Sequence, residues 1–424
     1  MAPSSSGPTG SSSGGDPARR DPAGPFGGIP DDVAGKIPLF AELQKLMSSS
    51  GPVNWELARQ LAIAAAAAGD RAAGPAELDE VRDALRLADV WLDVATSLPA
   101  GVTSVEAWTR VQWVERTQPT WTTLCDPVAA RVTAAMGTAL PEEVRAQAGP
   151  LLGVLGSVGG LMFGAQVGQA LGALAGEVLS STDVGLPLGP AGLGALVVGN
   201  VVAFGEGLEV PVGEVRLYVA LREAAHHRLY SHVPWLRAHV LGAVDAYARG
   251  INVDPEAISR AMSEIDPTDP ESLQAALGGG LFQPQQTPEQ QAALERLETA
   301  LALVEGWVSD VVDTAAVNLP SSAALGETMR RRRASGGPAE QTFATLVGLE
   351  LRPRRLREAA ALWAAVRDAR GVDARDATWS HPDLLPSAAD LGDPAGFVDG
   401  AGEPLHAPDE DAPPHVEPDG PAQA

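Results

Sequence analysis

Hydrophobic residues recur every three to four positions along most of this chain, which is the spacing of amphipathic helices. Asn54 and Thr287 stand where such runs begin and are predicted N-caps. No long stretch of the first half alternates with period two, so strands are not expected there. The predicted fold class is therefore predominantly α-helical, with helices over residues 37–47, 52–62, 76–98, 105–116, 127–136, 215–231, 255–265, 288–315 and 356–370.

Six glycines recur every four residues between Leu151 and Leu179, and this spacing lays a smooth stripe along a helix. They are Gly156, Gly160, Gly164, Gly168, Gly172 and Gly176. The run is long and free of charge, as a membrane span would be. However, Gln166 and Gln169 interrupt it and no basic flank follows. We expect a buried helix of a folded domain and no membrane span.

The composition of the chain divides it into three parts. Residues 1–34 are rich in Ser, Gly and Pro, and residues 399–424 are acidic and rich in Pro, so both ends are predicted to be disordered. Residues 35–398 are predicted to form a single large helical domain.

Charge and cysteine content exclude several classes of function. The net charge of −24 argues against nucleic-acid binding. The single cysteine, Cys125, excludes an intramolecular disulfide and a cysteine-based zinc cluster, and we expect it in the core. The first residues have no apolar leader core, which predicts a cytoplasmic protein.

Four of the seven histidines lie between Glu214 and Gly250. Among them is the sequence Arg222-Glu-Ala-Ala-His226, one substitution from H-E-x-x-H, in which two histidines hold zinc and the glutamate is the general base. Residues four apart share a helix face, so Arg222 is expected beside His226. A guanidinium has no free lone pair and cannot be a ligand. The local alternative to a zinc site is a cluster of ion pairs between helices.

A catalytic zinc site needs three protein ligands and an open position for water. Glu305 follows an apolar run and is the best candidate for a further ligand, although such an acid also suits a buried ion pair. The nitrogen that Arg222 cannot supply would have to come from His227, His232 or His239. His227 lies about 100° around the helix from His226 and would not point at the same metal.

Residues 330–333 are four consecutive arginines, and further arginines follow at 352, 354, 355 and 357. They suit either a site for phosphate or an acidic partner, or a solvated face that pairs with the protein's own acids. We favour the second interpretation.

Seven stretches carry a resemblance to a known family: IPLFAELQKL, PVNWELARQLA, GAQVGQALGALAGEVLS, LYVALREAAHHRLYSHVPWLRAHV, LALVEGWVSDVV, GGPAEQTFATLVGLELRPRRL and SHPDLLP, within residues 36–398. They resemble bacterial zinc-dependent metalloproteases and candidate hydrolases with a zincin-like domain (zincin-like metallopeptidase type 2). The resemblance implies a zinc hydrolase fold, with Glu223 as the general base and His226 and Glu305 as zinc ligands. Arg222 stands at the first ligand's position, and the branch most like this chain carries R-E-A-A-H there.

Two hypotheses follow. In the first, the protein is a zinc-dependent peptidase or hydrolase acting on an unidentified peptide or protein. In the second, it is a non-catalytic binding or structural protein that keeps the zincin fold, with a buried Arg-Glu-His network in place of the metal. A di-iron site built on Glu223-x-x-His226 would need a second E-x-x-H on another helix, and no other predicted helix carries one.

Overall fold

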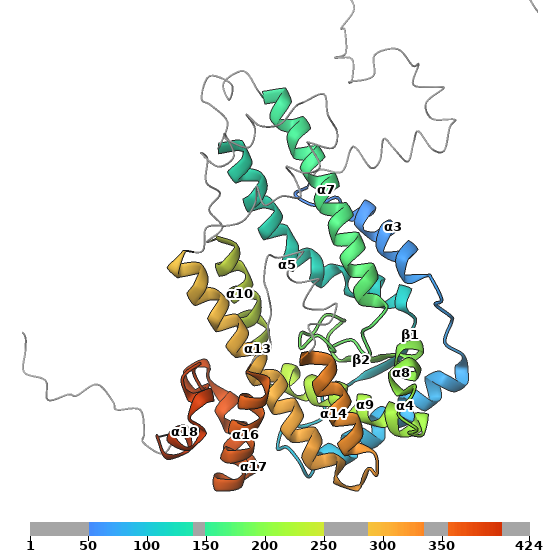
Figure 1. The fold of residues 1–424 in the computed structure, drawn as a ribbon, viewed down its shortest axis with the longest axis vertical. Helices are drawn as coiled ribbons and strands as arrows, with labels where there is room; N and C mark the ends of the chain where they lie inside the picture. The colour runs from blue at the N-terminus through green and yellow to red at the C-terminus, as the bar shows by residue number, and fades with distance from the viewer. Residues whose placement is uncertain (1–50, 139–148, 250–286, 335–354, 401–424) are drawn as a thin grey trace, which may run out of the picture. The chain divides into compact units, whose positions relative to one another are not determined.

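The computed structural model describes residues 51–138, 149–249, 287–334 and 355–400, all within one compact unit that spans residues 49–424. The described residues are predominantly α-helical, as predicted (Figure 1). Two short strands and several 3₁₀ turns accompany the helices. The elements are α3 (Trp55–Ala66), α4 (Pro75–Leu92), β1 (Ser104–Trp108), α5 (Arg110–Thr138), α7 (Gly149–Ala175), β2 (Leu193–Val197), α8 (Val198–Gly205), α9 (Val212–His232), α10 (Leu236–Arg249), α13 (Pro288–Ala315), α14 (Ser322–Ala334), α16 (Leu356–Arg370), α17 (Val372–Ala377) and α18 (Pro394–Gly400).

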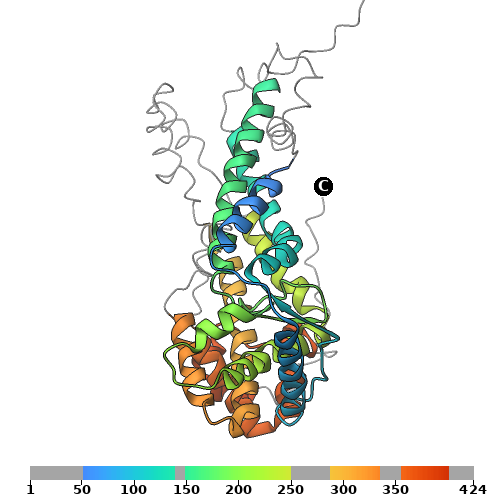
Figure 2. The same ribbon diagram turned by 90° about the vertical axis from the view of Figure 1, so that its right-hand side faces the viewer.

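The glycine stripe of α7 packs against α3, which lies alongside it in Figures 1 and 2. A Cβ added at Gly164 would lie 2.5 Å from the Asn54 carbonyl oxygen, and one at Gly168 would lie 2.6 Å from that of Ala58. The Asn54 side chain caps α3, and the backbone N–H of Asn54 donates to the Gly160 carbonyl at 2.8 Å. The helix backbones therefore approach within a distance that only glycine permits. The predicted glycine-rich helix is confirmed, but only the face that carries the glycines is buried, and Met162 is 43% exposed.

The prediction of no strands in the first half was wrong. β1 and β2 pair in parallel, from Ser104 opposite Leu193 to Trp108 opposite Val197. The helix predicted from residue 105 begins instead at Arg110. β2 is buried along its whole length, so its apolar run does not alternate. Pairing between such distant segments is not encoded in the local pattern of either one.

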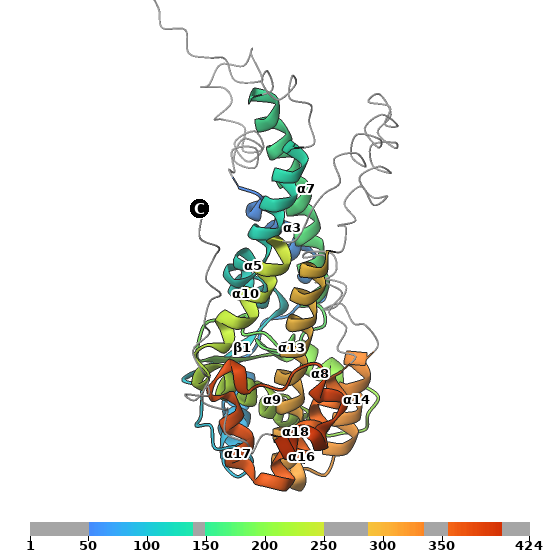
Figure 3. The same ribbon diagram turned by 90° about the vertical axis from the view of Figure 1, so that its left-hand side faces the viewer.

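Helix α9 lies at the centre of the fold. Its neighbours are α4, α8, β2, α13 and α14 (Figure 1), of which Figure 3 shows α8, α13 and α14 from another side. Every side chain from Leu217 to Leu229 is buried, including five that are polar or charged. Because buried polar groups need partners, α9 takes part in many of the interior hydrogen bonds and ion pairs of the described residues.

None of the helices in the described part of the chain is long and apolar enough to cross a membrane. The predicted helices 37–47 and 255–265, and the arginines at 352 and 354, lie outside the described residues. The predicted disordered segments 1–34 and 399–424 also lie outside the described residues, except for residues 399 and 400. The domain boundaries remain predictions.

The α3–α7 contact predicts opposite effects for two glycine substitutions. Gly168→Ala places a methyl group 2.6 Å from a backbone oxygen and should lower the free energy of unfolding by about 1–3 kcal/mol. Gly156→Ala meets no atom within 4 Å and should raise stability by up to about 1 kcal/mol through helix propensity. Urea unfolding of both variants checks this, and equal effects would contradict the close approach.

Candidate functional site

The sequence of α9 places its polar side chains on two separate sides of the helix. Arg222 and His226, one turn apart, face Glu305 on α13. Glu223 and His227, also one turn apart, face the segment that precedes β2. The residues predicted as metal ligands are therefore together, whereas the predicted general base lies on the other side.

Glu305 and Arg222 form a buried ion pair. Arg222 Nη2 lies 2.6 Å from Glu305 Oε2, and the two residues are 5% and 4% exposed. Burial alone would raise the pKa of Glu305, but the charges of Arg333, His226 and Arg222 outweigh it and hold the pKa well below its ordinary value. Glu305 is therefore a carboxylate whose charge is balanced within the protein.

His226 contacts an acceptor with each ring nitrogen. Nδ1 lies 2.8 Å from the Arg222 carbonyl oxygen, and Nε2 lies 3.0 Å from Glu305 Oε1. A carbonyl only accepts, so Nδ1 carries a hydrogen. Both ring nitrogens of His226 are therefore held by oxygen atoms of the protein, one on α9 and one on α13.

A second guanidinium reaches Glu305 from α14. Arg333 Nη1 lies 2.6 Å from Glu305 Oε2, the same oxygen that Arg222 contacts. Arg333 Nη2 also donates to the Asp183 carbonyl at 2.6 Å, while Arg332 pairs with the Asp183 carboxylate at 2.9 Å. The Asp183 carboxyl also has a lowered pKa: burial opposes the shift, and the two arginines outweigh it.

The predicted general base, Glu223, is fully buried and saturated with donors. Its carboxylate accepts hydrogen bonds from the Ser181 hydroxyl, from the hydroxyl and backbone N–H of Thr182, from the Ala195 backbone N–H at 3.0 Å and from His227 Nε2 at 3.2 Å. Burial works to raise the pKa of Glu223, but these hydrogen bonds and the His227 charge lower it to about 2. Glu223 ties α9 to β2 and to residues 181–182.

The other histidines do not join Glu305. His227 faces Glu223, and His232 is exposed with Nε2 3.4 Å from the Ala100 carbonyl. His239, on α10, packs edge-on against Trp235 at 5.6 Å between ring centroids. The alternative ligands considered from the sequence are therefore directed elsewhere.

The donor set around Glu305 does not fit zinc. Only His226 and Glu305 offer lone pairs, one fewer than a catalytic zinc site needs. The remaining two neighbours, Arg222 and Arg333, are cations without lone pairs and would repel a dication. Within the described ranges, no group of three or more His, Cys, Asp or Glu side chains is arranged to hold a metal ion.

Sequence reasoning placed Arg222, His226 and Glu305 together but missed Arg333. The arginine run was expected to form a solvated face, and Arg330 and Arg331 do pair with the nearby Glu327. Arg333 instead turns inward. Its position in a run of four arginines gave no signal that distinguished it from its neighbours.

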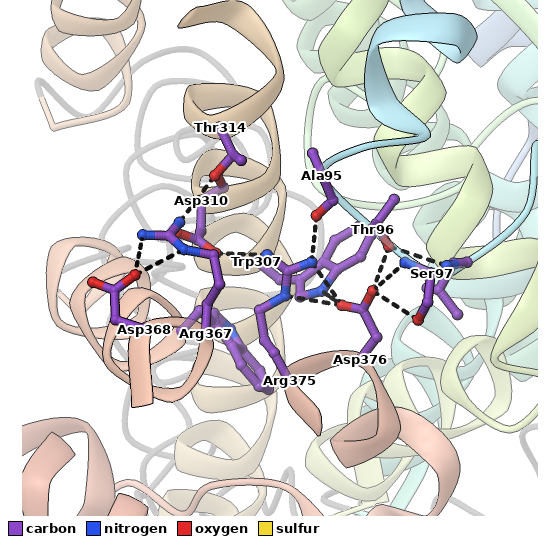
Figure 4. A network of polar contacts seen from close by, with 12 residues as sticks. Ala95, Thr96, Ser97, Trp307, Asp310, Thr314, Arg367, Asp368, Arg375 and Asp376 are labelled. Carbon is purple, nitrogen blue, oxygen red and sulfur yellow. Dashed lines mark hydrogen bonds and ion pairs between the residues drawn. The ribbon is translucent and has the colours of Figure 1, made fainter. Parts of the chain in front are cut away.

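A second buried network joins α13 and α17 to the segment after α4 (Figure 4). Arg375, fully buried, pairs with Asp310 at 2.7 Å and donates to the Ala95 carbonyl at 2.7 Å. Asp376 accepts from Trp307 Nε1 at 2.9 Å. Figure 4 shows Arg375 between its acidic partners, so these charges are satisfied within the protein, and the network fixes the C-terminal helices to the core.

The Glu223 hydrogen bonds predict a pH-dependent stability. A carboxyl whose folded pKa is about 2, against an ordinary 4.5, contributes about 3 kcal/mol above pH 4.5, and this contribution is lost as the pH falls toward 2. Glu223→Gln should therefore cost about 3 kcal/mol at pH 7 and progressively less below pH 4.5. Urea unfolding from pH 7 to pH 3 measures the difference. A difference that does not change with pH would argue against an ionised Glu223.

Comparisons with known proteins agree with this fold. A family model for zincin-like metallopeptidases matches residues 53–398. Among solved structures, the chain is similar to a candidate hydrolase with a novel fold from Chloroflexus aurantiacus, at 20% identity and a TM-score of 0.58, over 82% of this chain and 98% of that one. This likeness shows the fold alone. A search of curated proteins found no match. Because the family model covers well over half of the sequence, the chain belongs to the zincin-like metallopeptidase family.

Proposed function

We propose that this protein is a non-catalytic member of its family, a binding or structural protein in which an Arg-Glu-His network stands in place of the metal centre. The observation that carries the proposal is the 2.6 Å ion pair between Arg222 and Glu305. One partner occupies the position of the family's first zinc ligand, and the other occupies that of the third. The cation that Glu305 requires is thus supplied by a side chain.

The state of Glu223 supports the same proposal. A general base works best when its pKa lies near the working pH, and the pKa of Glu223 is about 2. Its oxygens are occupied by Ser181, Thr182 and Ala195, on a face of α9 about 100° around the helix from the one that meets Glu305. A proton acceptor held in this way contributes to folding rather than to the activation of water.

The second candidate function is a zinc-dependent hydrolase of peptides or proteins, and one observation favours it. His226 directs Nδ1 to a backbone carbonyl and Nε2 to Glu305, which is also the orientation of a zinc-bound histidine. This candidate requires Arg222 and Arg333 to leave Glu305 and another donor to replace them.

Metal content separates the two candidates. The full-length, untagged protein is incubated with zinc, freed of excess zinc and analysed by elemental mass spectrometry. We expect far less than about one zinc per chain. A chelator should leave its melting temperature unchanged. About one zinc per chain, together with chelator-sensitive peptidase activity, would establish the hydrolase instead.

The proposal also predicts that Arg222 is important for stability. Arg222→Ala should lower the free energy of unfolding by about 1.5–3 kcal/mol, because it removes one charged hydrogen-bond donor from a buried carboxylate that keeps Arg333 and His226. Arg216→Ala is the matched control on the same helix, since Arg216 pairs with the half-exposed Glu80 and should cost no more than about 1 kcal/mol. Equal small losses in urea unfolding would contradict a structural role for Arg222.

A further inference from the structure

Arg333 reaches Glu305 independently of Arg222. It belongs to α14, whereas Arg222 belongs to α9, yet both guanidinium groups contact Glu305 Oε2 at 2.6 Å. The Arg333 side chain is 14% exposed and also contacts Asp183, at 2.6 Å to the carbonyl and 3.5 Å to the carboxylate. Two cations from separate elements therefore share one carboxylate oxygen.

The end of α14 is anchored by contacts that do not involve Arg222. Leu325 and Met329 are buried on its inner face. Arg332 pairs with Asp183 at 2.9 Å and donates to the Glu177 carbonyl at 2.6 Å. These contacts fix the last turn of α14 against residues 177–183. Arg333 would consequently remain beside Glu305 after a change at position 222.

The other oxygen of Glu305 is enclosed as well. Oε1 faces His226 Nε2 at 3.0 Å, and Gly185 approaches so closely that an added Cβ would lie 3.0 Å from Oε1. Gly185 has a φ of +79°, and its carbonyl accepts from the Tyr230 hydroxyl at 2.7 Å. An ion entering this space would have to use Oε2, where Arg333 lies.

We propose that Arg333 is a second block to metal binding, which excludes a divalent cation from Glu305 even when a histidine stands at position 222. This inference rests on the proposed function, in which the protein holds no metal. Its physical basis is that like charges repel strongly in a water-poor interior, and a guanidinium 2.6 Å from Oε2 occupies the place of the ion. The metal site was thus replaced by two residues rather than one.

The test compares zinc binding by four full-length proteins: the wild type, Arg222→His, Arg222→His with Arg333→Ala, and Arg222→His with Arg331→Ala. Arg331→Ala is the matched control, because Arg331 lies on the same helix but is exposed and pairs with Glu327. Each protein is incubated with zinc alone, freed of excess and analysed by elemental mass spectrometry. Its melting temperature is measured with and without zinc.

We expect about one zinc per chain only in the variant that lacks both Arg222 and Arg333, with a zinc-dependent rise in its melting temperature. The single variant and the control should bind at least about tenfold less tightly, a difference of about 1.4 kcal/mol. If the double variant does not fold without metal, Arg222→His with Arg333→Gln removes the charge and keeps a donor for the Asp183 carbonyl.

Two results would overturn the inference. The first is that Arg222→His alone binds zinc as tightly as the double variant does. The second is that neither variant lacking Arg333 binds zinc, although both are folded. The proposed function fails on a different result, namely about one zinc per chain in the wild type. A zinc-free wild type beside a zinc-bound Arg222→His would leave the proposed function standing and remove only the role of Arg333.

Discussion

The charge of Glu305 is the constraint on which the centre of this protein depends. A carboxylate 4% exposed to solvent is costly unless a positive charge lies beside it. In a zinc hydrolase the metal would supply that charge. Here Arg222 and Arg333 supply it at 2.6 Å each, with His226 on the other oxygen. The same acid can therefore stay buried on α13 with side chains as its cations.

Arginine side chains in place of a zinc ion would change the chemistry of the site more than they change the contacts between α9 and α13. A bound zinc would connect α9 to α13, and the Arg222–Glu305 pair makes the same connection. Arg333 links α14 to these two helices, and its hydrogen bond to the Asp183 carbonyl also links the segment before β2. A guanidinium, however, cannot polarise a carbonyl as a Lewis acid or lower the pKa of bound water. Under the proposed function, the connection is kept and the chemistry of the metal is not.

The sequence predicted those features that depend on neighbouring residues. Thr287 caps α13 as expected, and Glu305 is buried because it lies within an apolar run. The ion pair of Arg222 could be anticipated because an acid in that setting needs a cation. The pairing of β1 with β2 and the inward turn of Arg333 could not. Both depend on contacts between segments that only the folded chain brings together.

The two carboxylates of this centre show why a motif alone does not define an activity. Glu223 and Glu305 are both buried, and the pKa of each is lowered, yet for different reasons. His227 and hydrogen bonds from neutral donors stabilise the charge of Glu223, whereas Arg333, His226 and Arg222 stabilise that of Glu305. In an active zincin the corresponding glutamate must be free to accept a proton from water. The five hydrogen bonds of Glu223 oppose that role independently of any metal, so the proposed function is supported by two separate observations, one at the base and one at the ligands.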